Sequence, residues 1–323
     1  MLSRIVTHQD FDGIVSAVLC SAALKIDTVS FTGPRHIQEA RFATSEEDVV
    51  CDLPCPLSCG LWFDHHAGNL EQLAYRQIDV QTIPGKFEAV ASCARVVYGY
   101  FQDKALFPGY YERLVEEADV IDSFNYQTLE EWRRETPGKI IDATVRVAFE
   151  YDYYRFLFDQ LKELPIEEVA ACSEVQSRYR DYLANEDLML KEIGKEARFL
   201  EEDIGHELIV LDLTHYRHPP QMVKNLAYLK FPDSLGVVFI RCVFEDGRKT
   251  NDLHVSMSLS IRGSREGLHQ VGEIMRQLNI GDGHAGAAAG TLSCKSKADM
   301  LSQKEKLLTK IDKLWRQQRN GCV

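Results

Sequence analysis

Short runs of apolar residues alternate with helix-compatible stretches along the first third of the chain. Residues 3–7 form the first apolar run, and apolar positions then recur at helical intervals from 14 to 24. Further strand-like runs follow at 29–31, 49–51 and 61–63. Strand-length runs that alternate with helices predict an α/β fold, in which helices cover both faces of a parallel sheet.

The remainder of the chain predicts a helical region and then a second mixed region. Residues 92–158 are mostly helical in pattern, and the charged stretch 166–202 predicts one or two helices that lead to a linker. We therefore expect a first domain over residues 1–203. A smaller α/β domain should follow over residues 204–323.

The pattern of the second domain contains three strand-like segments and a basic tail. The strand-like segments are 207–213, 236–244 and 253–261, and polar and apolar residues alternate in the last of them. The lysine-rich tail at 295–319 is typical of a solvated helix.

The composition of the chain limits the kinds of molecule that the protein is expected to bind. The chain has 323 residues, of which 45% are hydrophobic, so it can bury a sizeable core. Its net charge of −12 repels polyanions and disfavours binding to long duplex nucleic acid. No apolar run approaches the roughly 18 residues of a membrane helix, and the N-terminus lacks a signal pattern. We therefore expect a cytoplasmic protein that does not bind membranes.

Three of the nine cysteines, Cys51, Cys55 and Cys59, are evenly spaced. Thiolates at such intervals can hold zinc or part of an iron–sulfur cluster. The spacing matches no common metal framework, however, and no fourth ligand is evident. Reduced, mostly buried thiols are the favoured interpretation.

Candidate metal ligands recur at every second residue near the N-terminus. Residues 7–13 read Thr-His-Gln-Asp-Phe-Asp-Gly. In an extended backbone His8, Asp10 and Asp12 share one face, and Gly13 permits a tight entry into the following helix. A polar turn in which Asp12 caps that helix is the alternative.

Further candidates follow two other predicted strands. Asp52 comes directly after one strand, and Asp64, His65 and His66 come after the next. The carboxyl ends of parallel strands are where open α/β sheets bind ligands. Imidazole and carboxylate ligands together suit manganese, with magnesium, cobalt or zinc as competitors, and five or six such ligands imply two ions.

Two more segments contain candidate functional residues. Asp119 and Asp122 lie three apart in a helix-like segment, where they share one face. In the glycine-rich segment 281–290, glycines such as Gly283 let backbone amides approach an anion, and His284 adds a side-chain donor. A glycine- and alanine-rich helix is the alternative for this segment.

These motifs resemble those of the DHH phosphoesterase superfamily, which includes RecJ-like nucleases, nanoRNA and pAp phosphatases, cyclic dinucleotide phosphodiesterases and manganese pyrophosphatases. The motifs similar to its first three are, in order, His8-x-Asp10-x-Asp12-Gly13, Asp52 and Asp64-His65-His66. Ala118-Asp119-Val120 resembles the fourth motif, and an alignment that places Asp122 there is also open. Residues 281–290 resemble the signature of the DHHA1 domain, so the resemblance covers nearly the full chain.

The resemblance implies a hydrolase that activates water with two manganese ions. The first ion would be held by His8, Asp10 and Asp52. The second ion would be held by Asp12, Asp52, His65 and Asp119, so Asp52 would bridge the two ions.

The resemblance also implies roles around the metals. His66 would contact the phosphate or protonate the departing oxygen, and Asp64 would orient a ligating imidazole. Arg262, Gly283 and His284 would bind the substrate from the second domain. For Arg262, a solvated surface arginine is the alternative.

The format of a DHH domain joined to a small DHHA1 domain resembles enzymes that act on short oligonucleotides, pAp or dinucleotides. The acidic composition agrees with such small substrates. Hydrolysis of polyphosphate or pyrophosphate is one alternative, and a metal-dependent nucleotide-binding regulator without turnover is another. A homodimer is compatible with the sequence.

Overall fold

The computed structural model describes residues 1–101, 107–147, 150–245 and 247–321. The chain forms two compact units. The first comprises Met1–Tyr126 and Glu130–Leu183, and the second comprises Gln127–Leu129 and Ala184–Val323. The division falls within the long helix α10 (Ser173–Glu196).

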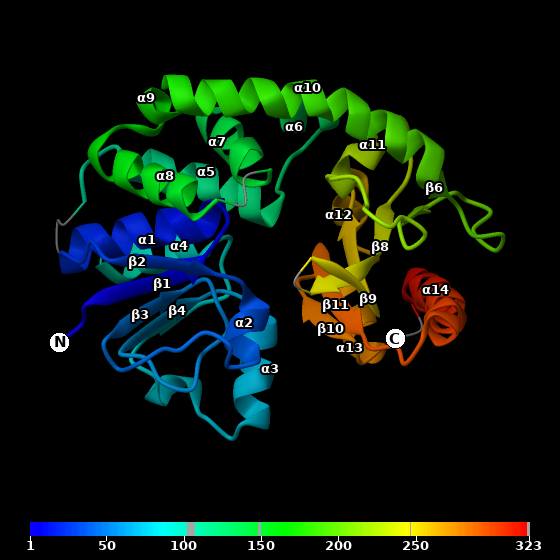
Figure 1. Cartoon of the computed structure of the whole chain (residues 1–323), viewed down its shortest axis with the longest axis horizontal. Coiled ribbons are helices and arrows are strands. Elements are labelled where there is room, and N and C mark those ends of the chain that lie inside the picture. The colour runs from blue at the N-terminus through cyan, green and yellow to red at the C-terminus, as the bar shows by residue number, and fades with distance from the viewer. Residues whose placement is uncertain (102–106, 148–149, 246, 322–323) are drawn as a thin grey trace. The chain divides into compact units, whose positions relative to one another are not determined.

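The first unit contains a five-stranded sheet in the order β2-β1-β3-β4-β5, and all neighbouring strands are parallel (Figure 1). This confirms the predicted α/β class. The strands are β1 (Arg4–His8), β2 (Val29–Thr32), β3 (Asp48–Cys51), β4 (Leu61–Asp64) and β5 (Gly85–Phe87).

Alternating strand residues enter two different hydrophobic cores. Ile5 and Val49 belong to a large core, whereas their neighbours Val6 and Val50 belong to a smaller one on the opposite face. The large core includes side chains of α1 (Phe11–Leu24), α4 (Cys93–Phe101), α5 (Tyr111–Ser123), α7 (Pro137–Val145) and α8 (Tyr151–Glu163). The smaller core lies beneath α2 (Pro34–Gln38) and α3 (Ala67–Tyr75). Helices therefore cover both faces, as the sequence predicted.

The region after β5 is helical, as expected. Besides α4, α5, α7 and α8, it contains the short helices α6 (Leu129–Arg133) and α9 (Ile166–Ala171).

The second unit contains a mixed six-stranded sheet in the order β10-β11-β9-β8-β7-β6. Strands β7 and β8 are parallel, and the other pairs are antiparallel. The strands are β6 (Ala197–Arg198), β7 (Leu208–Asp212), β8 (Gly236–Glu245), β9 (Arg248–Leu259), β10 (Gly281–Gly283) and β11 (Ala287–Leu292). The helices are α11 (Ala227–Lys230), α12 (Ile261–Glu266), α13 (Val271–Gln277) and α14 (Lys297–Arg319).

Helix α14 differs from the solvated helix that its lysines suggested. Leu308, Ile311 and Trp315 are buried in the core of the second unit. Lys304 is also buried, and its ammonium group lies 2.6 Å from a carboxylate oxygen of Asp212. The apolar residues recur at helical intervals and form a stripe that packs on the sheet, while the other lysines face solvent.

No helix in the described ranges is long and apolar enough to span a membrane.

The loop between α12 and α13 packs a histidine against α14. The ring of His269 stacks on Trp315 with a centroid separation of 3.7 Å and an interplanar angle of 10°. His269 is 2% exposed, and neither ring nitrogen has a hydrogen-bond partner within the described residues. Burial lowers the pKa of His269 to about 4, so the folded protein holds this imidazole in its neutral form.

We expect His269 to make stability fall as the pH falls from about 6.5 to about 4. Over this range the unfolded chain binds a proton at His269 and the folded chain does not. The free energy of unfolding should therefore decrease by up to about 3 kcal/mol at the acidic end of the range. His269→Phe keeps the stacking but cannot be protonated, so urea unfolding should show a flatter pH dependence. The exposed His218 provides the control, because His218→Phe should keep the wild-type pH dependence. If the free energy of unfolding had the same pH dependence in wild type and in His269→Phe, this role of His269 would be contradicted.

Candidate metal centre

The junction of β1 and α1 places the first two candidate ligands. His8 ends β1, and Asp10 caps α1 by accepting a hydrogen bond from the backbone N–H of Gly13 at 2.9 Å. Asp10 therefore makes the cap that the sequence alternative gave to Asp12. A Cβ atom on Gly13 would lie 2.3 Å from the carbonyl oxygen of His8, so only glycine fits this close approach. The Nδ1 atom of His8 lies 2.7 Å from Oδ2 of Asp10.

Asp12 is buried in the first turn of α1. Its carboxylate accepts hydrogen bonds from the backbone N–H groups of Cys93, at 2.7 Å, and Ala94, at 2.9 Å. These residues begin α4, and the amides at a helix N-terminus stabilise a negative charge. The N-terminus of α4 thus fixes the carboxylate of Asp12.

Asp52 is the most constrained residue of the site. It directly follows β3, is 2% exposed and has a left-handed backbone with a φ of 56°. This conformation is uncommon for residues other than glycine, although aspartate and asparagine adopt it more readily than most. Neither of its carboxylate oxygens has a hydrogen-bond partner among the residues described. The nearest imidazole nitrogens, those of His8, His65 and His66, lie 3.5, 3.7 and 3.7 Å away.

His65 follows β4 and directs one nitrogen at three carboxylates. Its Nδ1 atom lies 3.0 Å from the carbonyl oxygen of Val90, which fixes the ring orientation. Its Nε2 atom lies 3.4 Å from Asp122, 3.7 Å from Asp12 and 3.7 Å from Asp52. This arrangement directs the Nε2 atom toward the centre of the acidic cluster.

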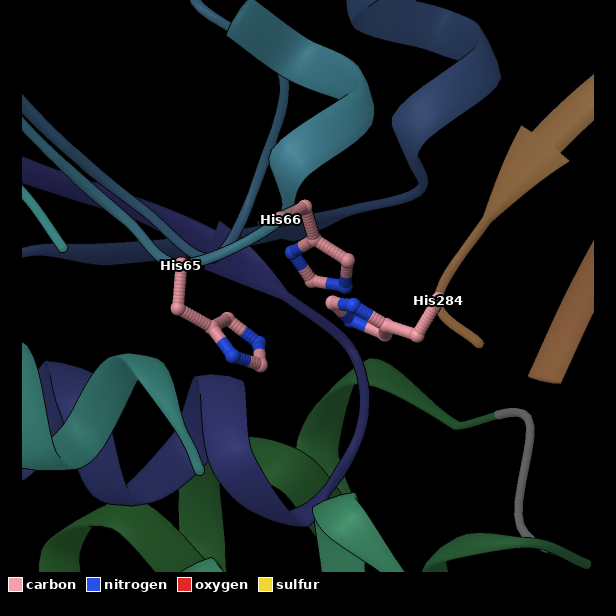
Figure 2. Close-up of side chains that lie close together, drawn as sticks. All are labelled: His65, His66 and His284. Atoms are coloured by element: carbon pink, nitrogen blue, oxygen red, sulfur yellow. The ribbon is translucent and has the colours of Figure 1, made fainter. Parts of the chain in front are cut away.

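His66 lies beside His65 and is oriented by Asp64. Figure 2 shows the two rings projecting from consecutive residues. Their centroids lie 4.2 Å apart. Nδ1 of His66 lies 2.9 Å from Oδ1 of Asp64, and the side-chain amide of Asn69 donates to Oδ2 of Asp64 at 2.5 Å. Asp64 is fully buried, so it is well placed to orient His66.

Asp122 joins the acidic cluster and Asp119 does not. Both lie on α5, but the Asp119 carboxylate accepts hydrogen bonds from Ser92, at 2.6 Å, and from Arg95, at 2.9 and 2.5 Å. Asp122 instead approaches His65. The geometry therefore favours the alternative alignment, in which Asp122 supplies the fourth motif.

The charges of the cluster strongly perturb its pKa values. Burial, together with the charges of Asp52 and Asp122, raises the pKa of Asp12 well above its usual value. Burial also raises the pKa of Asp122 to about 7. Although burial lowers the pKa of His65, the nearby carboxylates outweigh it and raise that pKa to about 11. Crowded carboxylates that favour protons also favour metal cations.

Within the first unit, three groups of side chains have candidate ligand atoms within 4.8 Å of one another. They are His8, Asp10 and Asp52, then Asp12, His65 and Asp122, and then Asp52, Asp64 and His66. Asp52 belongs to the first and third groups, and its Oδ1 atom lies 3.7 Å from Nε2 of His65 in the second. All of these donors are oxygen or nitrogen, which suits manganese or magnesium.

Several residues around the cluster were not identified from the sequence. Asn69 and Arg95 position Asp64 and Asp119, and neither belongs to a recognisable motif. Arg146, which follows α7, donates to Asp142 at 2.5 Å, and the charges of Asp142 and Asp10 keep its pKa raised. Arg146 is thus a positive charge near Asp10, one of the candidate metal ligands.

The candidates of the second unit lie on α12 and on a hairpin. Arg262 belongs to α12, because β9 ends at Leu259, two residues before the predicted strand end. Its guanidinium group donates to Glu266 at 2.9 Å, and it lines a cavity of about 420 Å³ together with Arg265 and Tyr228.

The glycine-rich segment forms the β10–β11 hairpin rather than a helix. His284 lies between the two strands, and its backbone N–H donates to the carbonyl oxygen of Ala287 at 2.7 Å. Gly283 has a φ of 157°, and a Cβ atom there would lie 2.3 Å from the same carbonyl oxygen. The hairpin therefore requires glycine at this position. The side chain of Asp282 lies outside the described part of the chain.

Solved structures show similarity along nearly the whole chain. A pGpG-specific phosphodiesterase, PggH, from Vibrio cholerae is 24% identical with a TM-score of 0.66, and the match covers 96% of this chain and 99% of that one. RecJ from Thermus thermophilus in complex with Mn²⁺ is 15% identical with a TM-score of 0.53, over 97% of this chain and 52% of that one. The DHH domain of a protein described as a member of a family of ribosomal proteins is 13% identical with a TM-score of 0.54, over 97% and 86% of the two chains.

These similarities confirm that the chain has a DHH-type fold, as its sequence motifs implied. No protein-family model matches the sequence, and no curated protein matches it.

We expect Asp122→Asn to weaken manganese binding by more than about 10-fold, because loss of even an outer partner of a metal ligand costs about 10–100-fold. Asp119→Asn should leave the affinity within about threefold of wild type, since Asp119 is engaged by Arg95. Isothermal titration with manganese would measure both, and thermal melts would verify folding. The reverse order of effects would show that Asp119 is the ligand.

Proposed function

We propose that this chain is a divalent-metal-dependent phosphoesterase that hydrolyses phosphate ester bonds in short oligonucleotides or small nucleotides. The observation that supports this proposal most strongly is the buried carboxylate of Asp52, which groups with His8 and Asp10 as candidate metal ligands and lies 3.7 Å from His65 of a second candidate group. The DHH-type fold supports the proposal, because a structural neighbour with this fold is a phosphodiesterase.

His8, Asp10 and Asp52 would hold one cation, and Asp12, His65 and Asp122 would hold the other, with Asp52 contributing to both. Two such cations would activate a water molecule and neutralise the oxygens of the attacked phosphoryl group. Manganese is the favoured metal, with magnesium, cobalt or zinc as competitors.

His66 is suited to act on the departing oxygen. Burial lowers the pKa of His66, but its hydrogen bond with Asp64 outweighs this and keeps the pKa above its ordinary value of 6.5. With Nδ1 directed at Asp64, the Nε2 atom can hold a proton and donate it to the leaving group. In the first unit, Arg146 would contact phosphate oxygens. In the second unit, Arg262, Gly283 and His284 are the proposed substrate-binding residues.

A small substrate suits the charge of the chain. With a net charge of −12, a long polynucleotide gains little affinity from counterion release outside the site. A dinucleotide can be neutralised by two cations and a few local donors. The activity of the neighbour PggH on pGpG, a small dinucleotide, supports the same substrate class.

Asp52→Asn should reduce phosphoesterase activity in manganese by more than about 100-fold, since it removes charge from both cation groups. Folding should survive, because asparagine has a similar shape and tolerates a left-handed backbone. The assay would use pAp, linear and cyclic dinucleotides, and polyphosphate. Asp119→Asn serves as a matched control with a neutralised carboxylate.

Wild-type activity in Asp52→Asn would refute the assigned role of Asp52. Manganese binding by the wild type without turnover of any substrate would favour a nucleotide-binding regulator. Turnover of polyphosphate alone would favour an exopolyphosphatase.

Catalytic efficiency should fall as substrates lengthen from dinucleotides to about 24-mers, a range chosen to exceed a single-strand groove of about 4–16 nucleotides. The salt dependence of binding should be shallow, because few phosphates are contacted. Single-stranded RNA and DNA series at several salt concentrations would measure both. Highest efficiency on the longest strands, with a steep salt slope, would favour a RecJ-like exonuclease.

A further inference from the structure

A cavity of about 420 Å³ lies beside α12 in the second unit. All of the residues that line it belong to that unit, and Arg262, Arg265 and Glu266 are among them. Small-molecule sites in proteins have volumes of roughly 300–1,000 Å³, so this cavity is large enough to hold a ligand. Its chemistry indicates which kind of ligand fits.

Three charged side chains line the cavity from one face of α12. Arg262, Arg265 and Glu266 are three and four residues apart, which places them side by side on the helix. Nε of Arg262 donates to Oε1 of Glu266 at 2.9 Å, and Nη1 of Arg265 donates to the carbonyl oxygen of Gln127 at 3.2 Å. A guanidinium group has five N–H donors, and a carboxylate accepts several hydrogen bonds. These contacts therefore leave both donors and acceptors for a ligand.

Apolar surface completes the lining. Tyr228, Pro232 and Ile261 contribute it, and the hydroxyl of Tyr228 donates to the carbonyl oxygen of Ser258 at 2.7 Å, which fixes the ring. Nucleobases unstacked from a single strand pack against aromatic side chains and guanidinium planes. A bare phosphate group fits less well, because the carboxylate of Glu266 repels it. The lining thus suits a flat ring with polar edges.

We propose that this cavity binds a guanine base of the substrate, and that Glu266 accepts hydrogen bonds from the base. This inference rests on the proposed function, in which the substrate is a nucleotide. Guanine has two adjacent N–H donors, on N1 and on the exocyclic N2 amine, and one carboxylate can accept both. Its O6 atom lies next to N1 and accepts a hydrogen bond, which the guanidinium of Arg262 can donate beside Glu266.

The same carboxylate discriminates against the other bases. Adenine and cytosine have an exocyclic amine, but the ring nitrogen beside it presents a lone pair, which the carboxylate repels. Uracil has a single N–H donor between two carbonyl oxygens, so one carboxylate oxygen is left without a partner. Buried polar groups without partners are costly, and Glu266 is therefore the specificity-determining residue.

The test is isothermal titration of the full-length protein with GMP, inosine monophosphate, AMP and CMP. A chelator removes metal, so that no ligand is hydrolysed during the titration. The four ligands share ribose and phosphate, and the ratios of their affinities therefore report on the base. GMP should bind at least about 10-fold more tightly than AMP or CMP. Inosine monophosphate lacks only the N2 amine, and it should bind at least about threefold more weakly than GMP.

Glu266→Gln should reduce the preference for GMP over AMP to less than about threefold, because an amide offers a single acceptor oxygen. Glu273→Gln on α13 is the matched control, since Glu273 does not line the cavity, and it should keep the wild-type preference. Thermal melts would verify that both variants fold. A GMP preference that survives in Glu266→Gln would overturn the assignment of Glu266.

The ratios in the wild type test the inference without any variant. Equal affinities for the four ligands would overturn it, even if the protein hydrolyses nucleotides as proposed. Selective binding of GMP would support it, even if no phosphate ester is hydrolysed and the proposed function fails. The two proposals can therefore fail separately.

Discussion

The candidate metal centre depends on the negative charge concentrated around the buried carboxylate of Asp52. Asp52 is 2% exposed, and the imidazoles of His65 and His8 outweigh the effect of burial and keep its pKa low, so that it stays ionised. Asp12, Asp10 and Asp122 add further carboxylates around it. An ionised group buried without hydrogen-bond donors is costly unless positive charge is present. A bound cation would offset the negative charge that these carboxylates bring together.

The parallel sheet explains why these residues meet. Strands β1, β3 and β4 are adjacent and parallel, so His8, Asp52 and His65 emerge at the same edge. Helix α4 then approaches with its N-terminal amides directed at Asp12, and α5 brings Asp122 to His65. The helices after β5 thus complete a cluster that the strands begin.

Much of this arrangement could be predicted from the sequence, because apolar runs that end in ligand residues reveal both the strands and the edge where they end. The choice between Asp119 and Asp122 could not be predicted, since both share one helical face and only the contact with Arg95 separates them. Helix α14 was wrongly expected to be solvated, because its many lysines obscured a stripe of buried residues ending at Trp315. Cys51 lies on β3 and Cys55 in the loop that follows, and this separation depends on strand alternation and loop contacts that spacing alone does not define.

The most direct test of the central claim is a crystal structure of the protein grown with manganese, with anomalous diffraction measured at the manganese edge. The account predicts two anomalous peaks in the first unit, both contacting the carboxylate of Asp52, with His8 and Asp10 at one peak and Asp12, His65 and Asp122 at the other. A single peak, or peaks that leave Asp52 without a metal, would contradict the account.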